Sequence, residues 1–136
     1  MRRSGVLISV VMVGLAVGGW VAVNPAGQFG ISRYGITTFN RLPVPLMDLQ
    51  VRADGSMRVR LKTHDITADR LRWLTEGSPS VLIIAVGWEE SARVSSDVAL
   101  PEGGKVLILP TEAALSTFNA LQQRRVRVAI HVHSTC

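Results

Sequence analysis

The chain has 136 residues with a single cysteine, and its length and composition exclude several classes of protein. Beyond a long apolar run there is room for one small domain, which can bury about two thirds of its unfolded surface without disulfides. The formal net charge is +5, but Arg2 and Arg3 flank the apolar run, which leaves 13 basic against 10 acidic residues elsewhere. Most other arginines are scattered and only 5% of residues are aromatic, so we expect no nucleic-acid partner.

Residues 5–23, GVLISVVMVGLAVGGWVAV, carry no charge. As a helix about 28 Å long they can just cross the hydrocarbon core of a bilayer. Trp20 lies near the far end, where an indole anchors at the membrane interface. We therefore predict residues 1–23 to be an N-terminal transmembrane anchor. A cleaved signal peptide is the alternative, because the small residues in AVG at 16–18 suit a signal peptidase.

The basic residues around this run bear on its orientation. Arg2 and Arg3 favour a cytoplasmic N-terminus, which places the domain on the extracytoplasmic side. Arg33 and Arg41, beyond the other end of the run, favour the opposite orientation. We expect a single-pass membrane protein and prefer the extracytoplasmic placement of its domain.

The residues after the anchor divide into a linker and one domain. Turn-forming residues in NPAGQFG predict a linker at 24–30, followed by a single α/β domain at 31–136. Asp54 and Gly55 form a strong two-residue hairpin signal between arms at 48–52 and 57–61. Both arms alternate apolar and polar residues, which is typical of a sheet with one face in water.

The second half of the domain alternates helices and strands. ITADRLRWLTEGSPS at 66–80 has helical spacing, with Asp65 or Thr67 as its cap. VLIIAVG at 81–87 is predicted as a strand covered on both faces, as in parallel pairing, and KVLIL at 105–109 as the next buried strand. A short helical turn is expected in SSDVALPEGG between them.

The last helix and strand are the clearest. PTEAALSTFNALQQRR predicts a helix with Thr111 as N-cap and an apolar face containing Leu115 and Phe118, while Arg124 and Arg125 complement its C-terminal dipole. VRVAIHVH at 126–133 alternates as a strand. The element order predicts an α/β layer with right-handed connections, extended or covered by the N-terminal β-hairpin region.

Two histidines and the cysteine lie close together at the end of the chain. His131, His133 and Cys136 form H-x-H-x-x-C, and His64 is the other histidine that could complete a metal site. The signal is weak because zinc sites need a fourth ligand or an arranged open position. We therefore expect histidines that hydrogen-bond at a strand end, with no metal and no cofactor.

Catalysis is also not expected. A cysteine nucleophile needs a lowered pKa, whereas the terminal carboxylate on Cys136 raises the pKa of its thiol. Glu89 and Glu90 follow a predicted strand, but adjacent carboxylates diverge and cannot act as an acid and base pair. We predict that the protein is not an enzyme.

A set of short motifs in the second half resembles a known family. They are a strand ending in a glycine turn, then P-T-x-x-A, F-N-x-L, R-V and a final H-x-T-C, and YGITTF, DLQVRADG and THDITADRLRWL are similar upstream. Their residues here are Gly87, Thr111, Ala114, Phe118, Asn119, Leu121, Arg127, Val128, His133, Thr135 and Cys136. They resemble the small domain family of unknown activity that includes mitochondrial complex I (NADH:ubiquinone oxidoreductase) assembly factor 3 and the adipogenesis-associated domain-containing protein.

The resemblance implies a three-layer sandwich with a mixed central sheet and a role in assembly or protein interaction. Two features depart from the family: Ala85 replaces a glycine that many relatives carry, and relatives mostly lack a membrane anchor. The expected function is thus a non-enzymatic, membrane-tethered accessory domain with a protein partner. The alternative is a small-ligand or metal binder using the Gly87 loop and the C-terminal histidines. The candidate binding or structural polar cluster is Gly87, Trp88, Glu89, Thr111, Asn119, His133, Thr135 and Cys136.

Overall fold

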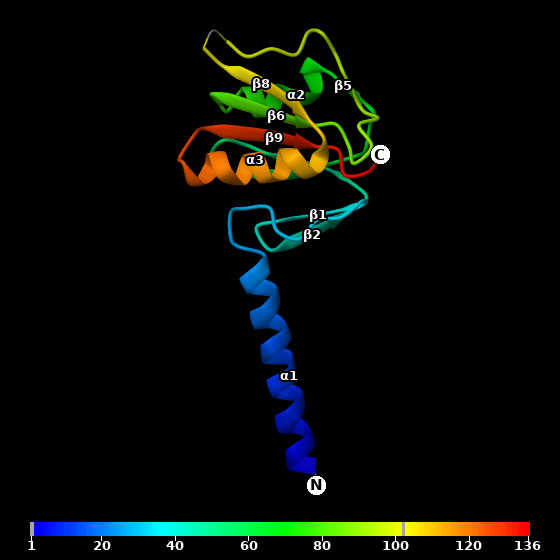
Figure 1. Ribbon diagram of the computed structural model, residues 1–136, viewed down its shortest axis with the longest axis vertical. Coiled ribbons are helices and arrows are strands. Elements are labelled where there is room, and N and C mark those ends of the chain that lie inside the picture. The colour runs from blue at the N-terminus through cyan, green and yellow to red at the C-terminus, as the bar shows by residue number, and fades with distance from the viewer. Residues whose placement is uncertain (1, 102) are drawn as a thin grey trace.

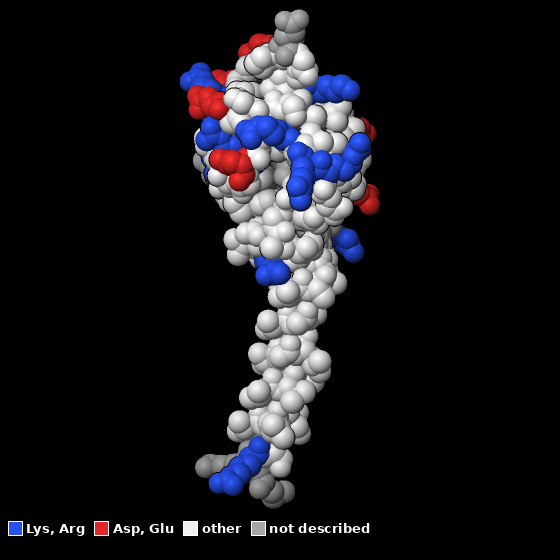
Figure 2. All heavy atoms as spheres, turned by 90° about the vertical axis from the view of Figure 1, so that its left-hand side faces the viewer, with Lys and Arg blue, Asp and Glu red and all other residues white. Residues whose placement is uncertain are grey.

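A computed structural model of the protein describes residues 2–101 and 103–136. Helix α1 (Arg2–Val23) projects away from a domain formed by the rest of the chain (Figure 1). Within Arg3–Val23, an 18-residue window of this helix has a mean hydropathy of 2.5, and none of that window is buried in the domain. Figure 2 shows no charged side chains along α1 between the domain and the lower end of the helix. This agrees with the sequence, which has no charged residue at 4–23. The helix is therefore long and apolar enough to cross a membrane, a criterion that a signal sequence also meets.

A mixed sheet of five strands forms the centre of the domain. Its order is β4 (Met57–Arg60), β3 (Asp48–Val51), β9 (Val128–Val132), β6 (Val81–Ala85) and β8 (Lys105–Leu109). Strand β3 pairs antiparallel with both β4 and β9, whereas β6 pairs parallel with both β8 and β9. The predicted hairpin, the buried parallel strand and the mixed sheet are all confirmed.

Helices cover both faces of this sheet (Figure 1). On one face lie α3 (Thr111–Gln123) and the hairpin of β1 (Ile36–Phe39) and β2 (Leu42–Pro45), which share a core around Phe29, Phe39 and Phe118. On the other face, α2 (Ala68–Thr75) packs with β5 (Asp65–Ile66) and β7 (Arg93–Val94) through a second core that includes Leu71, Leu74 and Leu82. The α/β three-layer sandwich is thereby confirmed.

A network of hydrogen bonds fixes the junction between α1 and the domain. Asn24 is fully buried, and its side chain donates to the Trp20 carbonyl at 3.0 Å and accepts from the Ile31 amide at 2.8 Å. The Trp20 indole donates to the Arg41 carbonyl at 3.1 Å, and the Arg41 side chain donates to the Asn24 carbonyl at 3.3 Å. Residues 24–30, the predicted linker, thus begin with a residue that joins the helix to the β1–β2 hairpin.

The polar face predicted for strands β3 and β4 does not lie in water as a whole. Asp48 and Gln50 are fully buried, because α2 covers their side of β3. On β4, which is an edge strand, the pattern fails in the other direction, since Val59 and the following Leu61 are exposed. Strand β8 is likewise an edge strand with Ile108 exposed, so its prediction as a buried strand is wrong.

Two local predictions, one about a helical turn and one about a helix cap, are also wrong. The described part of SSDVALPEGG (residues 95–101, 103 and 104) contains turns in place of the expected helical turn. Helix α3 has Pro110 at its N-cap, and the Thr111 side chain makes no capping bond because it bridges two other segments. Arg124 and Arg125 follow the last residue of this helix. In α2, by contrast, Thr67 caps the helix by accepting from the Arg70 amide.

Candidate functional site

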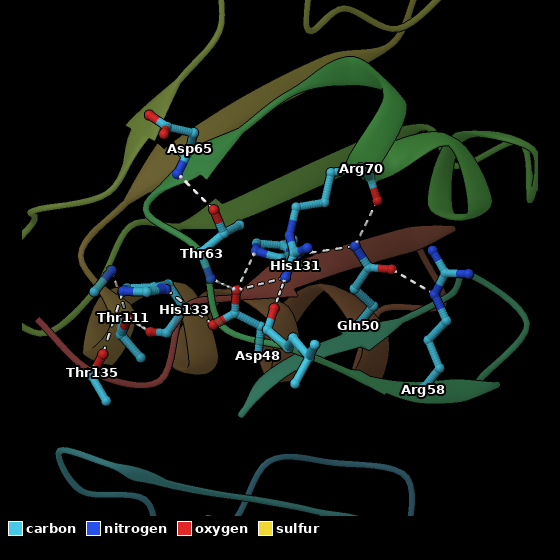
Figure 3. A network of polar contacts seen from close by, with 12 residues as sticks. Asp48, Gln50, Arg58, Thr63, Asp65, Arg70, Thr111, His131, His133 and Thr135 are labelled. Atoms are coloured by element: carbon cyan, nitrogen blue, oxygen red, sulfur yellow. Dashed lines mark hydrogen bonds and ion pairs between the residues drawn. The ribbon is translucent and has the colours of Figure 1, made fainter. Parts of the chain in front are cut away.

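A buried carboxylate at the start of β3 organises the polar residues of the domain. Asp48 is inaccessible to solvent, and its Oδ1 accepts a hydrogen bond from His133 Nδ1 at 3.0 Å (Figure 3). Its Oδ2 accepts from Arg70 Nη2 at 3.0 Å and from the Thr63 amide at 3.2 Å. The carboxylate therefore joins β3 to α2, to the segment before β5 and to the end of β9.

Gln50, two residues along β3, extends this network on the same face. Its amide nitrogen donates to the Arg70 carbonyl and to His131 Nδ1, each at 3.0 Å, and its oxygen accepts from Arg58 Nε at 2.8 Å (Figure 3). Gln50 lies directly opposite His131 in the β3–β9 register. Since His131 Nδ1 accepts, its proton belongs on Nε2, which faces Asp48 Oδ2 at 3.6 Å.

The three ionisable groups of the network titrate in different directions. Burial alone would raise the pKa of Asp48, but the imidazoles of His131 and His133 outweigh it and hold this pKa well below its usual range. Burial lowers the pKa of His131, whereas the hydrogen bond to Asp48 raises the pKa of His133. Asp48 is therefore ionised at neutral pH, and His133 is its more basic partner.

The other edge of the His133 ring faces a thiol. His64, His133 and Cys136 each offer one ligand atom, and these three atoms lie within 4.8 Å of one another. His64 Nε2 lies 3.1 Å from Cys136 Sγ, and the two imidazole rings are 4.8 Å apart between centroids. His133 is buried, Cys136 is half-buried and His64 is exposed. The cluster therefore opens to solvent on the side of His64.

The thiol of this cluster is more acidic than an ordinary cysteine. The hydrogen bond with His64 lowers the pKa of Cys136 to about 7, with further lowering by His133 and Thr135. The expectation of a raised pKa, based on the terminal carboxylate, is wrong because two imidazoles converge on the sulfur. The lowered pKa favours the thiolate form of Cys136, which is the form that reacts with electrophiles and binds metals.

Alkylation of Cys136 should reveal this acidity. With a metal chelator present, we expect the rate of iodoacetamide labelling to rise with a midpoint near pH 7, and His64→Gln should move that midpoint toward the ordinary value of about 8.5. Cys136→Ser is the blank, because the chain has no second cysteine. A midpoint near 8.5 in the unmodified protein, unchanged by His64→Gln, would refute the contact.

Most residues of the predicted polar cluster meet around the last residues of the chain. Thr111 Oγ1 accepts from the Gly87 amide at 3.1 Å and donates to the His133 carbonyl at 3.0 Å, and the Trp88 amide donates to the Thr135 carbonyl at 2.7 Å. A side chain on Gly87 would lie 1.8 Å from the Cys136 carbonyl oxygen. The end of the chain therefore occupies the space beside Gly87 that a ligand of this loop would need.

The remaining predicted residues lie outside that contact. Asn119, which the sequence grouped with His133 in one candidate cluster, instead forms two hydrogen bonds with the backbone of Phe29, at 2.9 and 2.8 Å. It lines a shallow groove together with Trp88. Glu89 is exposed. The pKa of Tyr34 is raised mainly by desolvation and further by the nearby charges of Cys136 and Glu89.

Sequence reasoning missed the centre of the site. Asp48, Gln50 and Arg70 were assigned to ordinary solvent-facing or helical positions, yet they hold the histidines. One signal was available in the sequence. Asp48 and Gln50 alternate along one predicted strand, as His131 and His133 do along another, so their side chains could form hydrogen bonds if the two strands paired. His64 was noted only as the remaining histidine, and its distance of 69 residues from His133 gave no sequence spacing to read.

Comparison with known proteins identifies the fold and leaves the function open. No family model and no curated protein matches the chain. The solved structure MT938 is similar with a TM-score of 0.68 and 23% identity, over 80% of this chain and 98% of its own. The conserved hypothetical protein PH1505 from Pyrococcus horikoshii OT3 has a TM-score of 0.63 and 18% identity, over 80% and 99%. An outer membrane protein from Bartonella henselae has a TM-score of 0.59 and 19% identity, over 83% and 99%.

Proposed function

We propose that the protein is a non-enzymatic accessory domain, tethered to a membrane by residues 5–23, that binds a membrane-bound protein partner. The observation that carries this proposal is helix α1, whose apolar window buries none of its residues in the domain. An apolar helix of this length whose side chains are not buried in protein is stable where lipid surrounds it. The domain is then held permanently at a bilayer surface.

The junction supports a positioning role for the tether. Because Asn24 is buried and bonded to both Trp20 and Ile31, α1 enters the domain at a defined place. The β1–β2 hairpin lies between α1 and α3 (Figure 1), and its exposed Leu42 follows Arg41, whose carbonyl accepts from the Trp20 indole of α1. Tethering of this kind raises the effective concentration of the domain near membrane-embedded partners.

The resemblance to the complex I assembly factor 3 family supports a role in assembling a membrane complex. Within this proposal the partner is a subunit of such a complex, and the domain lies on the extracytoplasmic side, as Arg2 and Arg3 favour. One of the structurally similar proteins is described as an outer membrane protein, which is consistent with a membrane location.

Photo-crosslinking in intact membranes tests the proposal. A photoreactive amino acid at Leu42, which is 55% exposed on the hairpin, should give a discrete crosslinked protein band. The matched control is Ile108, which is 53% exposed on the edge strand β8 at the far side of the sheet, and it should give no such band. Crosslinks from Leu42 to lipid alone, or identical bands from both positions, would contradict a protein partner at this face.

A further inference from the structure

We propose that His64, His133 and Cys136 form a binding site for a borderline-soft divalent cation, with Zn²⁺ as the ion of best fit and one coordination position left open. From the sequence alone, His131 and His133 are expected only to form hydrogen bonds at a strand end. In the fold, the segment before β5 brings in His64 as a third ligand, and His131 turns to Gln50 and Asp48. The site is independent of the membrane-tethered function proposed above.

The donor atoms and their spacing suit zinc. Zinc binds imidazole nitrogen at about 2.0 Å and thiolate sulfur at about 2.3 Å, so neighbouring ligand atoms around a tetrahedral ion lie roughly 3.3–3.6 Å apart. His64 Nε2 and Cys136 Sγ are already 3.1 Å apart, and no pair among the three ligand atoms exceeds 4.8 Å. Closing a pair that is 4.8 Å apart to this spacing takes a movement of about 1.2–1.5 Å. Side-chain rotation of the exposed His64 can supply it.

A hydrogen bond to the buried Asp48 carboxylate fixes His133, which is the ligand least able to move. His133 Nδ1 donates to Asp48 Oδ1 at 3.0 Å, which leaves the lone pair of Nε2 free on the side of the cluster. A carboxylate behind a histidine is the usual support of a metal ligand, because it fixes the tautomer and strengthens the donor nitrogen. The weak contact of His133 Nε2 with Thr135 Oγ1, at 3.4 Å, does not compete with a metal.

The same carboxylate also orders the segment that carries His64. Asp48 Oδ2 accepts from the Thr63 amide at 3.2 Å, and the Thr63 hydroxyl accepts from the Asp65 amide at 3.2 Å (Figure 3). Both neighbours of His64 are therefore bonded, and one of them is tied to the residue that supports His133. The two imidazoles are arranged by one buried group before any ion arrives.

A nucleophilic thiol is the competing use of these residues, and the surroundings favour a metal. Acyl transfer needs free backbone amides near the sulfur to stabilise an oxyanion. The amides of Gly87 and Trp88, which lie beside the end of the chain, already donate to Thr111 Oγ1 and to the Thr135 carbonyl. For a metal site, by contrast, the surroundings are suitable. His64, the third ligand, is exposed, so one side of the ion is left open to water or to a partner's side chain.

Zinc and cobalt binding by the full chain in detergent tests the site. Competition with a chromogenic chelator, under a reductant that does not bind metals, should give one Zn²⁺ per chain. Co²⁺ should give the thiolate-to-cobalt charge-transfer band. His64→Gln and Cys136→Ser should each weaken Zn²⁺ binding by roughly 10-fold or more, since losing a group that only hydrogen-bonds to a metal ligand already has an effect of that size. Cys136→Ser should also abolish the band.

Both variants change accessible side chains, so they should fold, and near-ultraviolet circular dichroism confirms it. Asp65→Asn, next to His64 and exposed, is the matched control and should bind Zn²⁺ as tightly as the unmodified protein. The inference is overturned if no stoichiometric Zn²⁺ is bound, if the cobalt complex lacks the sulfur band, or if His64→Gln and Cys136→Ser bind like Asp65→Asn, which would indicate adventitious binding only.

Discussion

Replacing Asp48 with alanine should lower the free energy of unfolding by about 3–5 kcal/mol, because it removes one partner from a buried charged network. Asp48 is inaccessible to solvent, and the change leaves His133 Nδ1 and the Thr63 amide without their acceptor. Arg70 Nη2 loses its carboxylate partner and keeps only the Leu61 carbonyl. Denaturant titration in detergent, followed by the fluorescence of Trp73 and Trp88 in the domain, measures the effect.

The matched control is Asp65→Ala. Asp65 pairs with Arg93 at 3.1 Å, but the two side chains are 66% and 80% exposed, so the loss should be about 0–1 kcal/mol. Equal losses for Asp48→Ala and Asp65→Ala would show that the buried network does not stabilise the fold.

The pH dependence of stability gives a second readout of Asp48. Its pKa in the folded protein lies below the unfolded value of about 3.9, so its contribution is complete above that pH and is lost as the pH falls further. The unmodified protein should therefore lose stability in acid more steeply than Asp48→Ala. Parallel curves would contradict the lowered pKa.

The second large effect is expected at Gly87, where alanine should destabilise the protein by about 3 kcal/mol or more. The residue has φ of +105°, a conformation that L side chains rarely adopt, and a Cβ there would lie 1.8 Å from the Cys136 carbonyl oxygen and 2.3 Å from its carbon. Backbone strain of this kind amounts to about 1–3 kcal/mol, and displacing packed atoms adds a similar amount. Thermal or denaturant unfolding measures the sum.

Gly55→Ala separates the effect of backbone strain from the effect of displacing packed atoms. Gly55 has φ of +88° in the β3–β4 turn, and a Cβ there would meet nothing within 4 Å. Strain alone should therefore destabilise this variant by about 1–2 kcal/mol. If Gly87→Ala were no worse than Gly55→Ala, the end of the chain would not be packed against Gly87 as described.

Much of the fold could be predicted from periodicity and turn chemistry. Asp54 and Gly55 located the β3–β4 hairpin, and the unbroken apolar run in β6 indicated a central parallel strand. Helix α3 was predicted from the spacing of Ala114, Leu115 and Phe118, all of which are buried. These signals are local, so they do not depend on which elements meet in space.

The errors arise where a residue's role depends on a distant segment. Alternation in β3 was taken for a face in water, but α2 lies over that face and turns Asp48 and Gln50 into buried polar residues. Thr111 has the side chain of a helix cap, yet it bonds Gly87 and His133 because the ends of β6 and β9 lie beside it. Sequence patterns alone do not distinguish such alternatives.

The polar residues at the end of the chain illustrate the same limit. His133 does lie just after a strand end, as predicted, but that strand is β9, the middle strand of the sheet order, and the side chain is fully buried. The sequence predicts a raised pKa for the Cys136 thiol because of the terminal carboxylate. It gives no sign of the contact with His64, which lies 72 residues away in sequence. Only the fold brings the two imidazoles, the sulfur and Asp48 together.

The most direct test of membrane tethering is alkaline carbonate extraction combined with the intact mass of the protein recovered from cells. If residues 5–23 tether the domain, the protein stays in the membrane pellet and its mass includes these residues. Deletion of these residues should release a folded domain into the soluble fraction. Mature protein that is extracted by carbonate and has lost these residues would identify them as a cleaved signal peptide and contradict the account.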